Sequence, residues 1–180
     1  MADERKVVIF CSSSHEIDPA YGKAARQLVR ALCAKGYTIV SGGSFRGMMG
    51  DVSDEVVRCG GRHVGVLPRF LSAYAYDGLT QLVWTDTMAD RKEKMREGTC
   101  AAIALPGGPG TLDELFETWT LSKLGRYPGK VIAYDAGGFY APLRALVAAL
   151  SDEKMLDDHA RNLLRFATGA EEILSMIESE

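Results

Sequence analysis

The chain has 180 residues, of which 47% are hydrophobic and 25% are charged, a composition typical of a globular protein that buries a core. A formal net charge of -3 argues against an electrostatic surface that recruits nucleic acid. No apolar run has the length of a membrane span, and the amino end lacks the apolar stretch of a signal peptide. We therefore expect one cytoplasmic domain over residues 1–180 that binds neither nucleic acid nor a membrane.

The cysteines and histidines do not form a metal-binding pattern. The four cysteines contain no Cys-x-x-Cys pair, and the three histidines lie far apart at His15, His63 and His159. We expect the cysteines to be reduced and mostly buried, and we expect no metal site.

Hydrophobic periodicity predicts strands that alternate with helices. Compact apolar runs indicate strands at residues 7–10, 37–40, 63–68, 82–84, 103–105 and 131–134. Helical spacing predicts helices at residues 18–35, 52–57, 87–96, 111–124, 143–150 and 170–177, and residues 71–79 are expected to be irregular. This alternation predicts a doubly wound parallel α/β sheet with helices on both faces and ligand sites at the carboxyl ends of the strands.

One glycine-rich stretch stands where a buried strand ends and a helix begins. Pro106 ends an apolar run, and Gly107, Gly108 and Gly110 precede a helix that is expected to start at Thr111. Glycines allow backbone N–H groups to approach a ligand, and the helix adds its free N–H groups and the positive end of its dipole. The stretch therefore predicts a phosphate site.

The same stretch also fits a purely structural role. Thr111 and Glu114 have the spacing of a capping box, in which each side chain accepts a hydrogen bond from the backbone N–H of the other residue. A capping box does not need the preceding glycines, so phosphate binding is the favoured interpretation of the whole segment.

Two other loops follow predicted strands. Residues 12–14 are all serine, and their hydroxyls can reach a ligand or bond their own backbone, which is the commoner fate of serine clusters. The turn of residues 41–50 contains four glycines but matches neither a P-loop nor the Gly-x-Gly-x-x-Gly dinucleotide motif. Ligand binding and close packing of a helix on the sheet both remain open for this turn.

The helix predicted for residues 87–96 places a charged residue among apolar ones. Met88, Arg91 and Met95 fall on one face, so the Arg91 guanidinium points where apolar neighbours point and needs a partner. That partner is either a protein carboxylate, with Glu114 as the candidate, or a substrate phosphate.

Three motifs occur in the order found in the LONELY GUY family, the cytokinin riboside 5'-monophosphate phosphoribohydrolases often mislabelled as lysine decarboxylases. Residues 106–114, Pro-Gly-Gly-Pro-Gly-Thr-Leu-Asp-Glu, match the family signature Pro-Gly-Gly-x-Gly-Thr-x-x-Glu. Residues 42–50 resemble its Gly-Gly-Gly-x-x-Gly-Leu-Met-Gly turn, and residues 88–92 resemble its Met-His-Glu-Arg-Lys segment. The resemblance spans almost the whole chain.

The resemblance implies a homodimeric Rossmann-like enzyme without metal or redox cofactor. The implied reaction hydrolyses the N-glycosidic bond of a nucleoside 5'-monophosphate, of the cytokinin type or plain AMP, to free base and ribose 5-phosphate. By position, the resemblance implies Arg91 and Glu114 as the catalytic pair. It implies further substrate-binding positions at Ser13, Gly43, Met88, Lys92, Gly107, Gly108, Gly110 and Thr111.

The chain departs from the family pattern at several positions without losing Arg91 or Glu114. The differing residues are Ser44, Ala89, Asp90, Cys100 and Lys123. They leave open which base is released, so a broader nucleoside-monophosphate nucleosidase in base salvage is an alternative. A non-catalytic nucleotide or cofactor carrier on the same sheet is another, because a fold alone does not fix a function. A pyridoxal-phosphate decarboxylase is the poorest alternative, since nothing marks a Schiff-base lysine.

Overall fold

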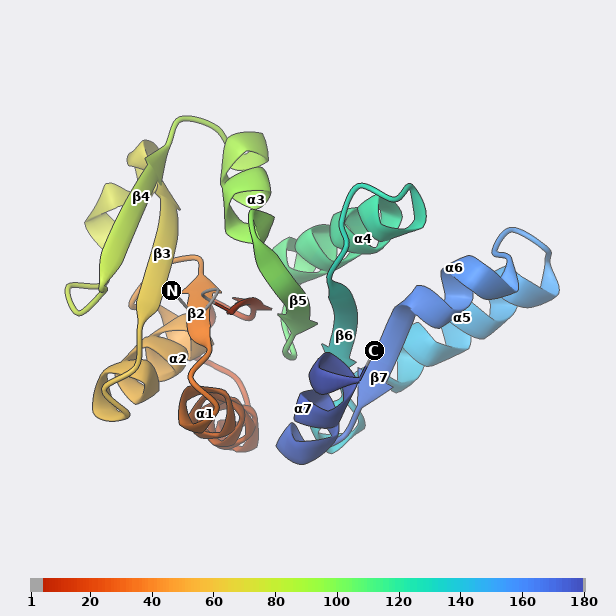
Figure 1. Cartoon of the computed structure of the whole chain (residues 1–180), viewed down its shortest axis with the longest axis horizontal. Coiled ribbons are helices and arrows are strands. Elements are labelled where there is room, and N and C mark those ends of the chain that lie inside the picture. Colours follow the sequence, from red (N-terminus) through yellow and green to blue (C-terminus); the bar gives the residue numbers. More distant parts are fainter. Residues whose placement is uncertain (1–4, 180) are drawn as a thin grey trace.

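The computed structural model describes residues 5–179, which form a seven-stranded sheet in which every neighbouring pair of strands is parallel. The strands lie in the order β4-β3-β2-β1-β5-β6-β7 (Figure 1). Their bounds are β1 Lys6–Phe10, β2 Thr38–Ser41, β3 His63–Pro68, β4 Gln81–Thr85, β5 Thr99–Ala104, β6 Lys130–Tyr134 and β7 Leu164–Ala167. The parallel α/β sheet predicted from the sequence is therefore confirmed.

Helices connect the strands, and three of them, α1, α3 and α6, begin at a residue whose side chain caps the helix. The Asp18 side chain accepts a hydrogen bond from the backbone N–H of Ala20 at the start of α1, and Thr87 caps α3 in the same way. The helices are α1 Pro19–Ala34, α2 Gly47–Arg58, α3 Met88–Arg96, α4 Pro109–Lys123, α5 Ala141–Asp152, α6 Asp158–Leu163 and α7 Ala170–Glu178, with short 3-10 helices η1 Arg69–Tyr74 and η2 Ala136–Gly138. None of the helices within residues 5–179 combines the length and the apolar character that crossing a membrane requires.

The structure differs from the sequence-based elements in several regions, including those of α6 and β7, η1 and α2. α6 and β7 were not predicted, because α6 passes directly into a four-residue strand without an intervening turn signal. Residues 71–79 are expected to be irregular, but η1 extends into this stretch and ends at Tyr74. α2 begins at Gly47, so the glycine-rich turn after β2 itself supplies the first turn of this helix.

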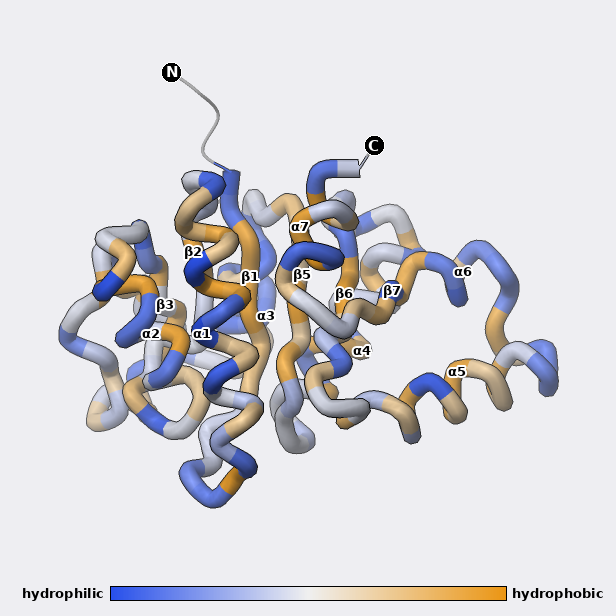
Figure 2. Tube along the Cα trace, turned by 90° about the horizontal axis from the view of Figure 1, so that it is seen from below, coloured by the Kyte–Doolittle hydropathy of each residue, from blue (hydrophilic) through white to orange (hydrophobic). Residues whose placement is uncertain are grey.

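Two apolar layers cover opposite faces of the sheet. Val7 and Ile9 of β1 pack with side chains of α1, α2 and α7, whereas Val8 and Phe10 pack with side chains of α3, α4 and α5. This alternation is the period-two pattern of a strand that is buried on both faces. Figure 1 shows α1, α2 and α7 below the sheet and α3 and α4 above it, and Figure 2 shows that β1 is largely hydrophobic. The prediction of helices on both faces is confirmed.

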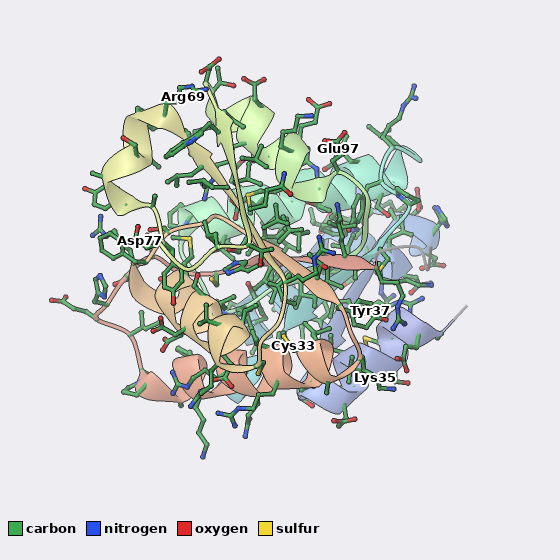
Figure 3. The ribbon with its side chains drawn as sticks, turned by 60° about the vertical axis from the view of Figure 1, so that its left-hand side comes forward. Cys33, Lys35, Tyr37, Arg69, Asp77 and Glu97 are labelled. Carbon is green, nitrogen blue, oxygen red and sulfur yellow. The ribbon has the colours of Figure 1, made fainter. Side chains whose placement is uncertain are left out.

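The strand order reverses beside β1. The chain builds outward from β1 through β2 and β3 to β4, and it then returns through α3 to place β5 on the other side of β1. The connections that follow β1 and β5 therefore run to opposite sides, which opens a crevice at the carboxyl edge of the sheet. Two residues labelled in Figure 3 help to locate the carboxyl and amino edges of the sheet. Arg69 follows the carboxyl end of β3, and Tyr37 precedes the amino end of β2.

Candidate active site

A cavity of about 480 Å³ opens at the carboxyl ends of β1 and β5, where the strand order reverses. The end of β1 with its serine loop, the turn before α2, one face of α3 and the start of α4 form its walls. The lining residues are Ile9, Phe10, Cys11, Ser12, Ser13, Ser14, Gly42, Arg46, Met49, Met88, Arg91, Met95, Gly108, Pro109, Gly110, Thr111, Asp113 and Glu114. The structure thus brings most of the predicted site residues together.

The start of α4 borders this cavity without a side-chain cap. The helix begins at Pro109, earlier than predicted, and its N-cap is Gly108. The capping-box interpretation is therefore wrong, because Thr111 lies inside the helix and no side chain of residues 5–179 caps it. A Cβ on Gly108 or Gly110 would meet open space, whereas a Cβ on Gly107 would lie 2.1 Å from Oγ1 of Thr111. Gly107 is thus required for packing, and the other two glycines keep the helix end open to a ligand.

Glu114 follows one turn later on α4 and contributes to the cavity wall, although only 8% of the residue is exposed. Burial disfavours the charged carboxylate and raises the pKa of Glu114 from 4.5 to about 7, while the positive charge of Arg91 opposes this rise. Glu114 therefore gains and loses a proton near neutral pH, which is the range that suits acid–base chemistry in an enzyme.

Arg91 lies opposite Glu114, and backbone carbonyls hold its guanidinium. Its Nε donates a hydrogen bond to the Val66 carbonyl at 3.0 Å, and its Nη2 donates one to the Gly42 carbonyl at 3.3 Å. Its Nη1 lies 3.8 Å from Oε1 of Glu114. The carboxylate expected as the partner of Arg91 is present, but this long contact contributes less to its orientation than the two carbonyls do.

The two glycines after β2 serve different purposes. Gly42 makes room for the catalytic candidate, because a Cβ there would lie 2.1 Å from Nη2 of Arg91. Gly43, which the resemblance implies as a ligand position, does not line the cavity; it has a φ of +67°, and a Cβ there would lie 2.9 Å from Cα of Gly65. Gly43 therefore supports the close-packing interpretation of the turn, and Gly42 is the member of the pair that shapes the site.

Replacing Gly42 by alanine is expected to reduce activity by about 10²-fold without unfolding the chain. The new Cβ would collide with the flexible end of Arg91, so the guanidinium would move while the backbone stays in place. Turnover of nucleotide substrates and thermal unfolding of the variant measure the two effects. Gly169→Ala is the matched control, because a Cβ there meets open space, and full activity of Gly42→Ala would contradict the prediction.

The face of α3 that the sequence predicts is the face that borders the cavity. Met88, Arg91 and Met95 all line it; Met95 is buried and Met88 is 41% exposed at the surface. Ser13, from the loop after β1, also lines the cavity. These side chains are therefore in place to contact a ligand.

Lys92 is not among the residues that line the cavity. Its Nζ lies 2.9 Å from Oδ2 of Asp113, which does line it. Conversely, sequence reasoning did not single out Cys11, Arg46 or Met49, which do line it. Cys11 ends the apolar run of the first strand, and the other two occupy the glycine-rich turn. The loops were identified correctly, but no residue pattern marks which of their side chains point inward.

Comparison with known proteins identifies the family of this chain. A family model described as "Possible lysine decarboxylase" matches residues 49–177. The cytokinin riboside 5'-monophosphate phosphoribohydrolase LOG2 of Arabidopsis thaliana is 35% identical over 177 residues, covering 97% of this chain and 83% of the relative. The chain belongs to the LONELY GUY family. A LONELY GUY relative from Mycobacterium tuberculosis, named cytokinin riboside 5'-monophosphate phosphoribohydrolase, is 36% identical over 151 residues, covering 81% of this chain and 79% of the relative.

Solved structures share the fold of this LONELY GUY protein. The structure titled TM1055 is 25% identical with a TM-score of 0.72, covering 97% of this chain and 98% of that one. The molybdenum cofactor binding protein of Rippkaea orientalis is 20% identical with a TM-score of 0.74, covering 99% of this chain and 98% of that one. At 20% identity, the similarity to the Rippkaea orientalis protein shows a common fold and does not indicate a common function.

Proposed function

We propose that this LONELY GUY protein hydrolyses the N-glycosidic bond of adenosine 5'-monophosphate, plain or N6-substituted, and releases the free base and ribose 5-phosphate. The observation that carries the proposal is the position of Glu114 beside Arg91, with their nearest charged atoms 3.8 Å apart, in a cavity that the uncapped start of α4 also borders. The names of the relatives from Arabidopsis thaliana and Mycobacterium tuberculosis support the same reaction.

The start of α4 suits the phosphate of such a nucleotide. Gly108, Gly110 and Thr111 line the cavity where the helix has unsatisfied backbone N–H groups and the positive end of its dipole. A phosphate held there lies away from the bond that breaks, so its binding energy positions the ribose for reaction.

Glu114 supplies the charge that the cleavage step requires. Positive charge develops on the ribose ring as the bond between C1' and the base nitrogen breaks. The ionised Glu114 stabilises this charge and orients or deprotonates a water molecule, whose oxygen bonds to C1' while the departing base takes up a proton. Arg91 either binds the phosphate or stabilises negative charge on the departing base, and both roles use its charged donors.

A carrier function is less favoured than hydrolysis. A protein that only holds a nucleotide or cofactor has no need for a buried carboxyl that titrates near pH 7 beside an arginine. A nucleosidase that accepts many bases would use the same catalytic pair, so the choice of base separates it from the proposed enzyme.

A panel of nucleotides tests the proposal. Purified protein is incubated with AMP, N6-isopentenyl-AMP, GMP and a pyrimidine monophosphate, and the liberated base is measured by chromatography. Preferential release of adenine-type bases supports the proposed enzyme, and release from all four nucleotides at similar rates supports the broader nucleosidase. Binding without release of any base would overturn hydrolysis in favour of a carrier.

We also propose that the enzyme is a cytoplasmic homodimer, as the family resemblance implies. The unpaired state of all four cysteines supports a reducing compartment. Light scattering of the purified protein tests the assembly, and a monomeric mass at assay concentrations would contradict the dimer.

The activity of the enzyme is expected to rise as the pH increases from about 6 to about 8. Glu114 must be ionised to stabilise the ribose cation, and its pKa of about 7 means that ionisation is completed only above neutral pH. The pH dependence of kcat at saturating AMP measures the acid limb. A limb in the ordinary range of glutamate, near its unperturbed pKa of 4.5, would contradict a buried catalytic carboxylate.

A further inference from the structure

Charged side chains on α3 face oppositely charged side chains on α4. Arg91 and Glu114 form the longest of these contacts, at 3.8 Å. Around that pair lies a network of ion pairs with shorter distances, which we call the α3–α4 clamp. Its members are Lys92 and Arg96 on α3 and Asp113 and Glu117 on α4.

Lys92 forms three contacts within the clamp. Its Nζ donates to Oδ2 of Asp113 at 2.9 Å and to Oδ1 at 3.2 Å, and it lies 3.1 Å from Oε2 of Glu117. Only 15% of the Lys92 side chain is exposed, and the hydrogen bond to Asp113 is the main cause that raises its pKa. The Lys92 ammonium group is thus held between two carboxylates of α4.

Arg96 connects the clamp to the sheet. It is 9% exposed, and its Nη1 donates to Oε2 of Glu117 at 2.8 Å. Its carbonyl accepts a hydrogen bond from Oγ1 of Thr99, the first residue of β5, at 2.9 Å. The clamp is therefore anchored at the strand that joins α3 to α4.

The clamp residues are direct neighbours of the catalytic pair in the sequence. Lys92 follows Arg91, and Asp113 precedes Glu114, so a backbone shift that separates one pair also separates the other. α3 has nine residues, and Met95 is the apolar side chain that it buries. Apolar packing alone thus constrains the rotation of this short helix weakly, and the charged contacts to α4 supply the remaining constraint.

We propose that Lys92 is a positioning residue, which acts through the α3–α4 clamp to hold Arg91 and Glu114 at their working separation. This inference rests on the proposed hydrolase function. It differs from the expectation that Lys92 contacts the substrate, and it assigns the lysine to the support of the catalytic pair.

The clamp also controls the electrostatic environment of Glu114. Arg91, Lys92 and Arg96 on α3 lower the pKa of Glu114, whereas Asp113 on its own helix raises it. The Cys11 thiol faces the same carboxyl from the end of β1, and burial and the charge of Glu114 raise the pKa of this thiol, so it stays neutral. Removing the positive charge of Lys92 therefore raises the pKa of Glu114, and removing the negative charge of Asp113 lowers it.

Two neutral substitutions with opposite effects on pH dependence test the proposal. Lys92→Met keeps the aliphatic stem and is expected to lower kcat about 10- to 100-fold with little change in KM, and to move the acid limb of kcat to higher pH. Asp113→Asn is expected to lower kcat as well but to move the limb to lower pH. Lys92→Arg, which keeps the charge and can bond both partners, is expected to recover most of the activity. Lys94→Met is the matched control, because that lysine pairs with Glu97 at the surface.

The outcomes separate positioning from substrate contact. A raised KM with unchanged kcat in Lys92→Met would show that the lysine binds substrate, and wild-type values of both would show that the clamp is unnecessary; either result overturns the proposal. Circular dichroism confirms folding, and Lys92→Gln replaces Lys92→Met if the latter does not fold. Carboxyl NMR titration of Glu114 gives a readout without turnover, so a rise of its pKa in Lys92→Met is expected even if the protein proves not to hydrolyse nucleotides.

Discussion

Replacing Glu114 by glutamine is expected to lower kcat/KM for nucleotide hydrolysis by about two to four orders of magnitude while the chain remains folded. Glutamine has nearly the same size but cannot ionise, so it neither stabilises the ribose cation nor accepts a proton from water. No helix cap is lost, because Gly108 is the N-cap of α4. Measuring the release of base tests the loss, and Glu97→Gln, at an exposed position, is the control. A folded Glu114→Gln variant with full turnover would refute a catalytic carboxylate.

The same variant tests the burial of Glu114 independently of activity. Because the folded chain retains a proton that the unfolded chain releases above about pH 4.5, this carboxyl lowers stability progressively between pH 4.5 and about pH 7. The pKa difference corresponds to about 2–4 kcal/mol. Relative to the wild type, Glu114→Gln is expected to gain this much in free energy of unfolding between about pH 4 and about pH 8. Denaturant unfolding of both proteins at both pH values measures the gain. The same change in free energy of unfolding with pH in the variant and the wild type would contradict it.

Replacing Arg91 by methionine is expected to lower kcat/KM by about two to three orders of magnitude. The variant loses the guanidinium donors that we propose act on the phosphate or on the departing base, and Glu114 loses the nearby cation that lowers its pKa. The acid limb of the remaining activity is therefore expected to lie above pH 7. Arg91→Lys keeps the charge but not the planar set of donors, so an intermediate activity is expected.

Comparing AMP with adenosine identifies the role of Arg91. If the guanidinium binds the phosphate, its removal weakens the reaction of AMP much more than that of adenosine, whereas stabilisation of the departing base gives equal losses. Arg69→Met is the control, because Arg69 is an exposed residue that pairs with Asp86 outside the cavity. Wild-type activity of Arg91→Met would contradict both roles.

The sheet was predictable from the sequence because its central strands are apolar on both faces. The run Val7–Phe10 has the continuous β-branched and aromatic character of a strand in a parallel sheet, and four of the five residues of β1 are buried. The edge strand β7 lacks this signal. It has four residues, its Arg165 and Phe166 are partly exposed, and the preceding helix leaves no glycine or proline between them.

The proximity of Arg91 and Glu114 was predictable in part for a physical reason. An arginine on an apolar helix face requires a partner, and this requirement pointed from Arg91 to Glu114. The start of α4 was placed incorrectly because Thr111 is a better cap by residue type than Gly108, although proline at the first helical position favours the observed start. The contacts of Lys92 could not be predicted, because they depend on the crossing of two helices that are separated by a strand.

The position of β5 limits how this enzyme can move during turnover. β5 lies between β1 and β6, five of its six residues are buried, and it joins the helix that carries Arg91 to the helix that carries Glu114. The two groups are connected through this buried central strand, so we expect their separation to change little during turnover. Nucleotide entry and product exit are therefore expected to depend on motions of peripheral loops, without the domain closure that many hydrolases use.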